Sequence, residues 1–247
     1  MQIDETGKIN NAISENNDNF VKNNENEQRN KISERVPQGE HGESDEVHSR
    51  IEEVSVFIRR CIETTREEQQ GLLSRHEQED VEKRAAFDYA KENGLWIDDL
   101  YSLGIPLLGG GNENTLAYDA KNNTIYKSNN LFNSQNSVSF LLNAIRYHNQ
   151  LFQNTKYELI GFTGFDNGAN HAPYIEVILC QDYIPNAEQA TRQEIAGYMQ
   201  SLKFNQINLH TFSNDWYIVS DLHPRNVLKN KSGDIFVVDN IIKENEV

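Results

Sequence analysis

The sequence predicts an α+β fold, and two observations lead to this class. Apolar residues recur at helical spacing across residues 49–93, whereas short apolar runs separated by turn residues take over from residue 95. In this second part the strand candidates come in pairs, with a helix between successive pairs. A doubly wound sheet would instead alternate single strands with helices, so we expect an α+β fold.

Composition limits the classes of function. The 247 residues include 23 Lys and Arg against 38 Asp and Glu, a formal charge of −15. This charge repels phosphate backbones and no basic cluster offsets it, so we expect no nucleic-acid partner. The sequence has no run of about 20 apolar residues and no signal-peptide pattern at its start, so we expect a cytoplasmic protein without membrane contact.

The chain before residue 95 divides into two predicted segments. Residues 1–45 are rich in Asn, Glu, Gln and Lys and too poor in apolar residues to close a core, which predicts a disordered arm. Residues 46–94 are predicted to form charged amphipathic helices, one long or two, between the capping box of Ser49 and Glu52 and the terminating Asn93-Gly94. This helical arm could pack on the following domain, bind a partner or dimerise, and the sequence leaves these alternatives open.

Residues 95–247 are predicted to form the second domain. Helices are expected over residues 135–152 and over Thr191–Leu202, where Thr191 and Glu194 form a capping box. The expected strands, from apolar runs bounded by turns, are Leu116–Tyr118, Thr124–Tyr126, Tyr157–Phe162, Tyr174–Cys180, Trp216–Val219, Val227–Leu228 and Ile235–Val238.

Polar residues near the C-terminal end of the sequence could bind a metal. Asp221 and Asn226 lie on a loop between two apolar strands, and Asp239 follows the second strand, 235–238. A hairpin would bring this loop and Asp239 to the same end. Carboxylate and amide oxygens suit Mg²⁺, which usually completes its coordination with water and phosphate oxygens. The group is therefore a candidate for phosphoryl transfer.

A phosphate-binding turn is the second requirement for this chemistry. Three glycines at 109–111 precede the first hairpin, where backbone N–H groups can approach phosphate oxygens without a Cβ in the way. Lys127 follows on the returning strand and could reach the α and β phosphates. Each feature alone has a plainer interpretation, because glycine triplets often form flexible turns and strand lysines are often solvated.

The order of these features along the chain is that of the protein-kinase signature set. The chain resembles the serine/threonine/tyrosine kinase domain found in polyvalent proteins of phages and conjugative elements, over about residues 80–245. The stretches that carry the resemblance are Trp96-Ile-Asp-Asp99, Gly109-Gly-Gly-Asn-Glu-Asn114, His148-Asn-Gln-Leu-Phe152, Tyr157-Glu-Leu-Ile-Gly-Phe162 and Asp221-Leu-His-Pro-Arg-Asn-Val-Leu228. It implies a two-lobe, protein-kinase-like fold for the domain at 95–247, with ATP and Mg²⁺ as cofactors.

The resemblance also implies roles for individual residues. Asp221 becomes the catalytic aspartate, Asn226 and Asp239 the Mg²⁺ ligands, and Lys127 the lysine on the α and β phosphates. The stretch Gln181-Asp-Tyr183 becomes the hinge that offers backbone groups to adenine. The phosphate-covering loop is formed by Gly109, Gly110, Gly111 and Asn114, in which Asn114 takes the place of a third signature glycine.

Three departures from the family pattern stand out. No Asp or Glu occurs between Lys127 and Glu158, so the helix at 135–152 cannot supply the usual glutamate partner of the lysine. Either Asp239 or Glu113 holds Lys127, or the lysine is mispositioned. The few residues after Asp239 leave no room for an activation segment, which implies a truncated C-terminal lobe. His223, in Asp221-Leu-His-Pro224, resembles the loop of small-molecule phosphotransferases.

Three functions remain open from the sequence. The first is a minimal kinase of a mobile element that phosphorylates a Ser, Thr or Tyr hydroxyl on itself or on a host protein. The second is a small-molecule phosphotransferase. The third is an inactive nucleotide-binding or protein-interaction module, since a fold does not fix a function.

Overall fold

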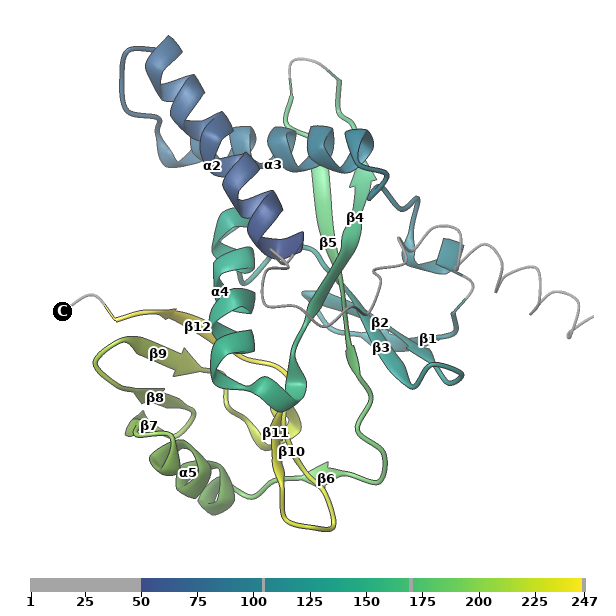
Figure 1. The fold of residues 1–247 in the computed structure, drawn as a ribbon, viewed down its shortest axis with the longest axis vertical. Helices are drawn as coiled ribbons and strands as arrows, with labels where there is room; N and C mark the ends of the chain where they lie inside the picture. Colours follow the sequence, from purple (N-terminus) through teal and green to yellow (C-terminus); the bar gives the residue numbers. More distant parts are fainter. Residues whose placement is uncertain (1–49, 104, 169–170, 246–247) are drawn as a thin grey trace, which may run out of the picture.

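The computed structural model describes residues 50–103, 105–168 and 171–245 (Figure 1). The arm predicted at 1–45 and the predicted cap Ser49 lie outside these residues. The described part is a mixed α+β fold of N-terminal helices and antiparallel sheets, as the sequence predicted. Within it, none of the helices is both long and apolar enough to cross a membrane.

The helical arm consists of two helices, α2 (Arg50–Glu68) and α3 (Arg75–Glu92). The chain leaves the first helix through Gln70, whose φ is 51°, and enters the second through a capping box formed by Ser74 and Glu77. Gly94 follows α3 with a φ of 67°, the left-handed conformation predicted for the end of the helix.

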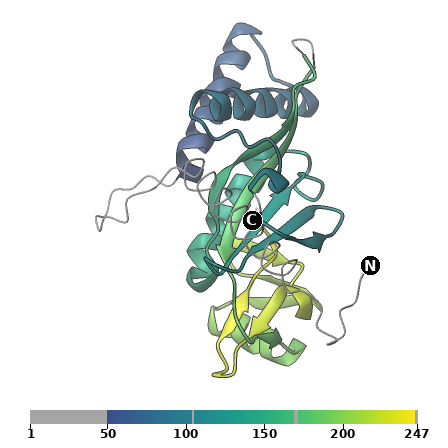
Figure 2. The same ribbon diagram turned by 90° about the vertical axis from the view of Figure 1, so that its right-hand side faces the viewer.

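A five-stranded antiparallel sheet follows the arm. Its spatial order is β1-β2-β3-β5-β4, and Figure 2 shows it between the arm helices and the C-terminal segment. The hairpin predicted around residues 116–126 is confirmed, with Ala117 opposite Tyr126. The sequence did not predict the first strand. The five strands are β1 (Leu107–Gly110), β2 (Asn114–Asp119), β3 (Thr124–Asn129), β4 (Glu158–Phe165) and β5 (Tyr174–Asp182).

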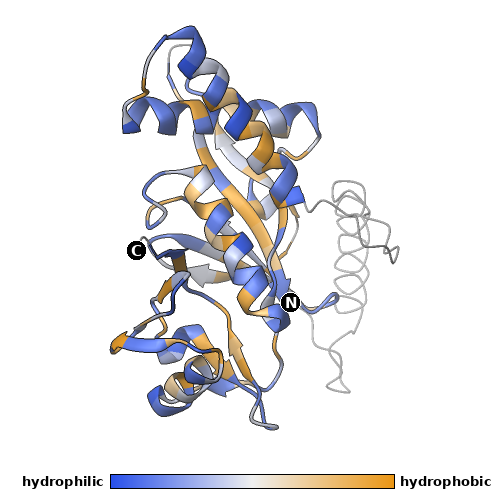
Figure 3. Ribbon diagram, turned by 60° about the vertical axis from the view of Figure 1, so that its left-hand side comes forward, coloured by the Kyte–Doolittle hydropathy of each residue, from blue (hydrophilic) through white to orange (hydrophobic). Residues whose placement is uncertain are grey.

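The arm and this sheet share one hydrophobic core. Helix α4 (Val138–Leu151) begins at the N-cap Ser137, whose side chain accepts a hydrogen bond from the backbone of Phe140. Its apolar face packs with α2, α3, β4 and β5, and Figure 3 shows apolar residues gathered along these elements. Each large apolar side chain buried there contributes roughly 1.5–3 kcal/mol. Of the three arrangements predicted for the helical arm, the structure shows the arm packed on the following domain. The predicted domain boundary at residue 95 stays a prediction.

The C-terminal segment forms two small antiparallel sheets around helix α5 (Arg192–Ser201). The capping box of Thr191 and Glu194 is confirmed. Strand β12 was not predicted, and it pairs with β9 so that Ile242 lies opposite Val219. The strands are β6 (Glu188–Gln189), β7 (Asn205–Asn208), β8 (Thr211–Ser213), β9 (Tyr217–Ser220), β10 (Val227–Lys229), β11 (Ile235–Val237) and β12 (Ile241–Glu244).

Candidate active site

A cavity of about 60 Å³ lies where the sheet, α4 and the segment after β11 meet. Four of the predicted site residues line it, namely Asn114, Lys127, Asp221 and Asp239. The lysine comes from the middle of the chain and the two aspartates from its end. The cavity therefore brings together the two groups of residues that the sequence placed about 100 positions apart.

Lys127 is buried at the base of this cavity. Its Nζ donates hydrogen bonds to the Tyr157 hydroxyl at 2.6 Å and to the Val238 carbonyl at 2.7 Å. Burial alone would lower the pKa of the Lys127 ammonium, but Tyr157, Asp239 and Glu113 outweigh it and the pKa lies above its ordinary value. The lysine is therefore charged, and its direct partners are neutral oxygens.

Tyr157 is the partner of Lys127 that the sequence did not reveal. Its hydroxyl accepts from Lys127 and donates to the Val238 carbonyl at 2.6 Å. Burial raises the pKa of Tyr157 to about 12, so the phenol keeps its proton. The predicted alternatives, Asp239 and Glu113, act on the lysine only through their charge.

Asp221 lies on a tight loop before β10. Its φ of 64° is left-handed, a strained conformation for a residue with a side chain. Asn226 Nδ2 donates to both the backbone oxygen and Oδ2 of Asp221 at 2.9 Å. His223 Nε2 lies 3.1 Å from Oδ1, so both carboxylate oxygens have a neighbour that fixes their orientation.

The hairpin expected to bring Asp239 to this loop is present. Strands β10 and β11 pair with Val227 opposite Val237. The Asn226 backbone oxygen accepts from the amides of Val238 at 2.9 Å and Asp239 at 3.3 Å. Asn226 does not itself line the cavity, but it joins Asp221 and Asp239 through its side chain and its backbone.

The two predicted Mg²⁺ ligands supply oxygen atoms. They are the Asp239 carboxylate, which lines the cavity, and the amide oxygen of Asn226, whose amide nitrogen is already used on Asp221. Both are hard oxygen donors, the type that Mg²⁺ prefers, and an ion held by two protein ligands takes its others from water and phosphate oxygens. No group of three or more His, Cys, Asp and Glu side chains suited to a metal occurs in the described part of the chain.

The glycine turn borders the cavity without lining it. Gly109 has a φ of 121°, and a Cβ on Gly110 would lie 2.5 Å from the Asn114 backbone oxygen, so both positions require glycine. Gly111 donates its amide to that same oxygen at 2.8 Å. Asn114 does line the cavity, but it begins β2 and is not left-handed, unlike the glycine it was expected to replace.

Comparison with known proteins places most of the chain in a family. The family model of serine/threonine/tyrosine kinases found in polyvalent proteins matches residues 79–246. The chain belongs to this kinase family. No curated protein matches, nor does any solved structure.

The hinge implied by the kinase resemblance lies away from the cavity. The Gln181 side chain donates to the Thr155 carbonyl at 2.5 Å, inside the core. The backbone of Tyr183 bonds to Asn123, donating to its carbonyl at 2.8 Å and accepting from its side chain at 3.2 Å. Neither residue lines the cavity, so adenine binding at the hinge stays a prediction.

His148 is a cavity residue to which sequence reasoning gave no role. It lies on α4 with Nε2 2.8 Å from the Thr155 carbonyl and Nδ1 3.3 Å from Oδ1 of Asn240. Burial lowers the pKa of His148 to about 4, so the ring is neutral at pH 7. It connects α4 to the residue after Asp239. The sequence feature that could have indicated a role for His148 is its place in His148–Phe152, one of the stretches that resemble the kinase family.

Proposed function

We propose that this kinase transfers the γ-phosphoryl group of ATP to a Ser, Thr or Tyr hydroxyl, on a protein or on itself. One observation carries the proposal. Lys127 and Asp239 face the same cavity, and Lys127 bonds to the carbonyl of the residue immediately before Asp239. A cation and a carboxylate held so closely suit a metal–phosphate group, which presents both kinds of charge.

Each side chain has a step to perform in this reaction. The charged Lys127 attracts phosphate oxygens. Asp221 orients the acceptor hydroxyl and takes up its proton. The hydroxyl oxygen forms a bond to the γ-phosphorus as the bond to the bridging oxygen breaks, and ADP leaves. The bonds from Asn226 and His223 support this role, because they fix the carboxylate before the substrate arrives.

Asp239 and Asn226 would hold Mg²⁺, which neutralises phosphate charge when it is bound. The volume of the cavity is large enough to enclose only the phosphate end of ATP with its metal ion. It is about 60 Å³, whereas pockets that enclose a whole cofactor measure roughly 300–1,000 Å³. The base and ribose would therefore lie outside the cavity, along its open side.

The arrangement of elements supports a two-lobe interpretation. The five-stranded sheet with α4 forms the larger part, and the segment after β5 forms the smaller part, which contains the single α-helix α5 within the described residues. The cavity lies between them. A larger and a smaller part with a cavity between them agree with the predicted two-lobe, kinase-like domain.

Labelled ATP tests the proposal. The protein is incubated with γ-labelled ATP and Mg²⁺, alone and with candidate protein substrates. We expect label on protein with the parent and none with Asp221→Ala, provided that the variant keeps the parent's circular dichroism spectrum. Label transfer by a folded Asp221→Ala protein would contradict the role of Asp221.

A small-molecule phosphotransferase is the second candidate. The observation in its favour is His223, which lies against the Asp221 carboxylate and resembles the loop of such enzymes. Under this alternative, ATP turnover would require an added metabolite and no label would appear on protein.

An inactive nucleotide-binding module is the third candidate. The observation in its favour is that the hydrogen-bond partners of Lys127 are neutral oxygens and not a glutamate. It predicts a higher melting temperature with ATP but no turnover under any condition.

A further inference from the structure

Glu82 is a buried carboxylate outside the cavity. It lies on α3 with a relative exposure of 1%, beside the apolar core that the arm shares with the sheet. A buried carboxylate is costly unless donors satisfy it, so its partners indicate what it does.

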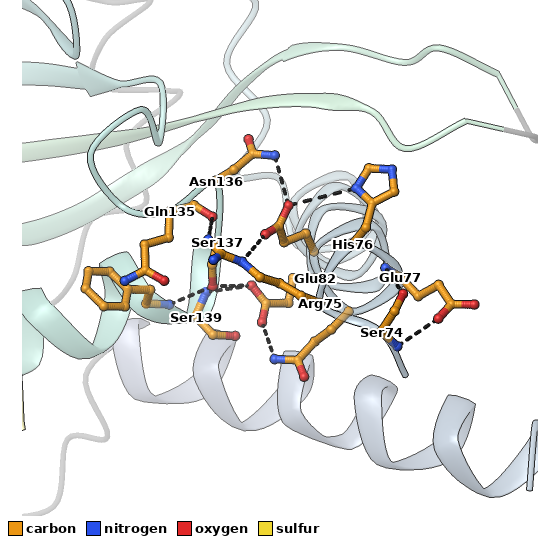
Figure 4. A network of polar contacts seen from close by, with 12 residues as sticks. Ser74, Arg75, His76, Glu77, Glu82, Gln135, Asn136, Ser137 and Ser139 are labelled. Atoms are coloured by element: carbon orange, nitrogen blue, oxygen red, sulfur yellow. Dashed lines mark hydrogen bonds and ion pairs between the residues drawn. The ribbon is translucent and has the colours of Figure 1, made fainter. Parts of the chain in front are cut away.

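Two of the three residues that donate hydrogen bonds to Glu82 are at the start of α4 (Figure 4). One carboxylate oxygen accepts from Ser137 Oγ at 2.6 Å and from the Ser139 amide at 3.2 Å. The other accepts from Gln78 Nε2 at 3.1 Å. Ser137 is the N-cap of α4, and a negative charge is favourable at the N-terminus of a helix. Glu82 therefore attaches the first turn of α4 to the arm.

Helix α3 also holds the chain between β3 and α4, residues 130–137, which we call the β3–α4 connection. Arg75 donates to the Gln135 carbonyl at 3.2 Å, and Asn136 donates to Glu79 at 3.2 Å. Leu131, Gln135 and Asn136 have φ values of 66°, 55° and 62°. Three left-handed residues with side chains are unfavourable by themselves, so the connection depends on these outside contacts.

The other side of the connection contacts the turn between β1 and β2. Asn133 donates to the Glu113 carboxylate at 2.7 Å. The Asn130 amide donates to the Glu113 carbonyl at 3.0 Å, and its side chain donates to the Asn112 carbonyl at 2.8 Å. Glu113 lines the cavity. The β3–α4 connection is therefore hydrogen-bonded to α3 on one side and to the cavity wall on the other.

We propose that Glu82 is a positioning residue: it fixes the start of α4 and the β3–α4 connection, and through them the turn at 112–114, so that the arm keeps the cavity assembled. The consequence for ATP affinity rests on the proposed function, whereas the structural coupling does not. The two helices of the arm, α2 and α3, then help to shape the cavity of the kinase domain.

Residue-resolved hydrogen exchange on the full chain tests the coupling. Glu82→Gln keeps the shape of the side chain but places an NH₂ group against donors. We expect the amides of Asn130, Ser134 and Ser137 to exchange at least about tenfold faster, which corresponds to about 1.4 kcal/mol. The amide of Val219, in the C-terminal segment, should not change. Glu92→Gln is the matched control, because it removes the same charge from an exposed position on α3.

Nucleotide binding gives the second readout. We expect KM for ATP to rise about tenfold in Glu82→Gln with kcat little changed, because the cavity wall is displaced. A mere loss of folded protein would instead lower the apparent kcat and leave KM unaltered. Exchange confined to α3, or an unchanged KM in a variant whose connection exchanges faster, would overturn the proposal. If the parent itself binds no ATP, the proposed function fails, while the exchange data still decide the coupling.

Asn133→Ala provides a test that does not depend on a buried substitution. The residue is exposed and lines the cavity, and the side-chain hydrogen bond that the substitution removes is the one to Glu113. Because a cavity residue could alter KM directly, the readout is hydrogen exchange alone. We expect faster exchange at Asn130, with Ser137 unchanged. If Asn130 exchanges as in the parent, the connection does not hold the turn and the proposal is wrong.

Discussion

The Lys127 ammonium lies 2.6 Å from the hydroxyl of Tyr157, and both groups are buried. This phenol replaces a carboxylate as the direct partner of the lysine. A carboxylate would orient the ammonium and also neutralise it. A neutral phenol orients it and leaves its charge available to an anion in the cavity.

Tyr157→Phe tests this relationship. The change removes one hydrogen bond at each of two partners, the buried Lys127 and the carbonyl of the half-buried Val238, which retain their bond to one another. We expect about 1–2 kcal/mol of lost stability, measured by urea unfolding, and a several-fold weaker affinity for Mg·ATP.

Tyr198→Phe is the matched control for this variant. Its hydroxyl makes none of the hydrogen bonds found in the described part of the structure, and the ring packs against a second hydrophobic core, formed mainly by the C-terminal segment around α5. We expect little effect on nucleotide affinity. Equal affinities for the parent and Tyr157→Phe would mean that the phenol does not orient the lysine.

The convergence of Asp221 and Asp239 could be predicted because it depends on local geometry. Two strands joined by a short turn must bring their outer ends together, whatever the rest of the fold does. The order of the motifs, which is that of the protein-kinase signature set, then predicted that this hairpin shares a site with Lys127. The capping box of Ser74 and Glu77, which divides the arm into two helices, was also present in the sequence as an S-x-x-E pattern and could have been found.

The contact of Lys127 with Tyr157 and Val238 could not be predicted. It joins residues separated by 30 and 111 positions, and only the packing of the sheet, α4 and the C-terminal segment on one another sets these distances. The same reason applies to Glu82. In the sequence it is one of many charged residues of a predicted helix, and only the packing of α4 against α3 gives it its partners. Strand β1 was missed because two of its four residues are glycine.

Asp239→Asn tests the metal assignment. The substitution keeps the size of the side chain and removes the carboxylate of one of the three acidic residues that line the cavity, Glu113, Asp221 and Asp239. We expect Mg·ATP affinity to fall at least about tenfold, measured by calorimetry with and without Mg²⁺, since hard cations prefer charged oxygens. Binding of ATP without Mg²⁺ should change less.

Asp215→Asn is the control for charge, because it removes a carboxylate from an exposed loop. If Asp239→Asn binds Mg·ATP as tightly as this control, Asp239 is not a ligand.

His148 predicts a pH dependence of stability. Burial lowers its pKa to about 4 from an ordinary value of 6.5, so the folded state binds fewer protons than the unfolded state between these values. Its contribution is therefore fully present above pH 6.5 and is lost as the pH falls toward 4. The magnitude is roughly 3 kcal/mol. Lys127 and Asp239 are the charged groups that act on the ring, with opposite effects.

His148→Gln isolates this contribution, because the amide cannot titrate. Urea unfolding at several pH values should show a shallower fall in the free energy of unfolding between pH 6.5 and 4 for the variant than for the parent. The slopes are compared and not the absolute values, because the substitution also alters packing at pH 7. Parallel curves would mean that His148 does not titrate in this range.

Gly110 and Gly111 form the most closely matched pair of variants in the chain. A Cβ at Gly110 would lie 2.5 Å from the Asn114 backbone oxygen, whereas one at Gly111 would meet nothing within 4 Å. Gly110→Ala must therefore displace Asn114, which lines the cavity and pairs with Asn129. We expect it to cost about 1–3 kcal/mol of stability and to weaken Mg·ATP binding. Gly111→Ala should be neutral or stabilising by up to about 1 kcal/mol, because it restricts the unfolded chain. Thermal unfolding and calorimetry of both variants decide the matter: equal losses would show that the close approach at Gly110 does not shape the turn.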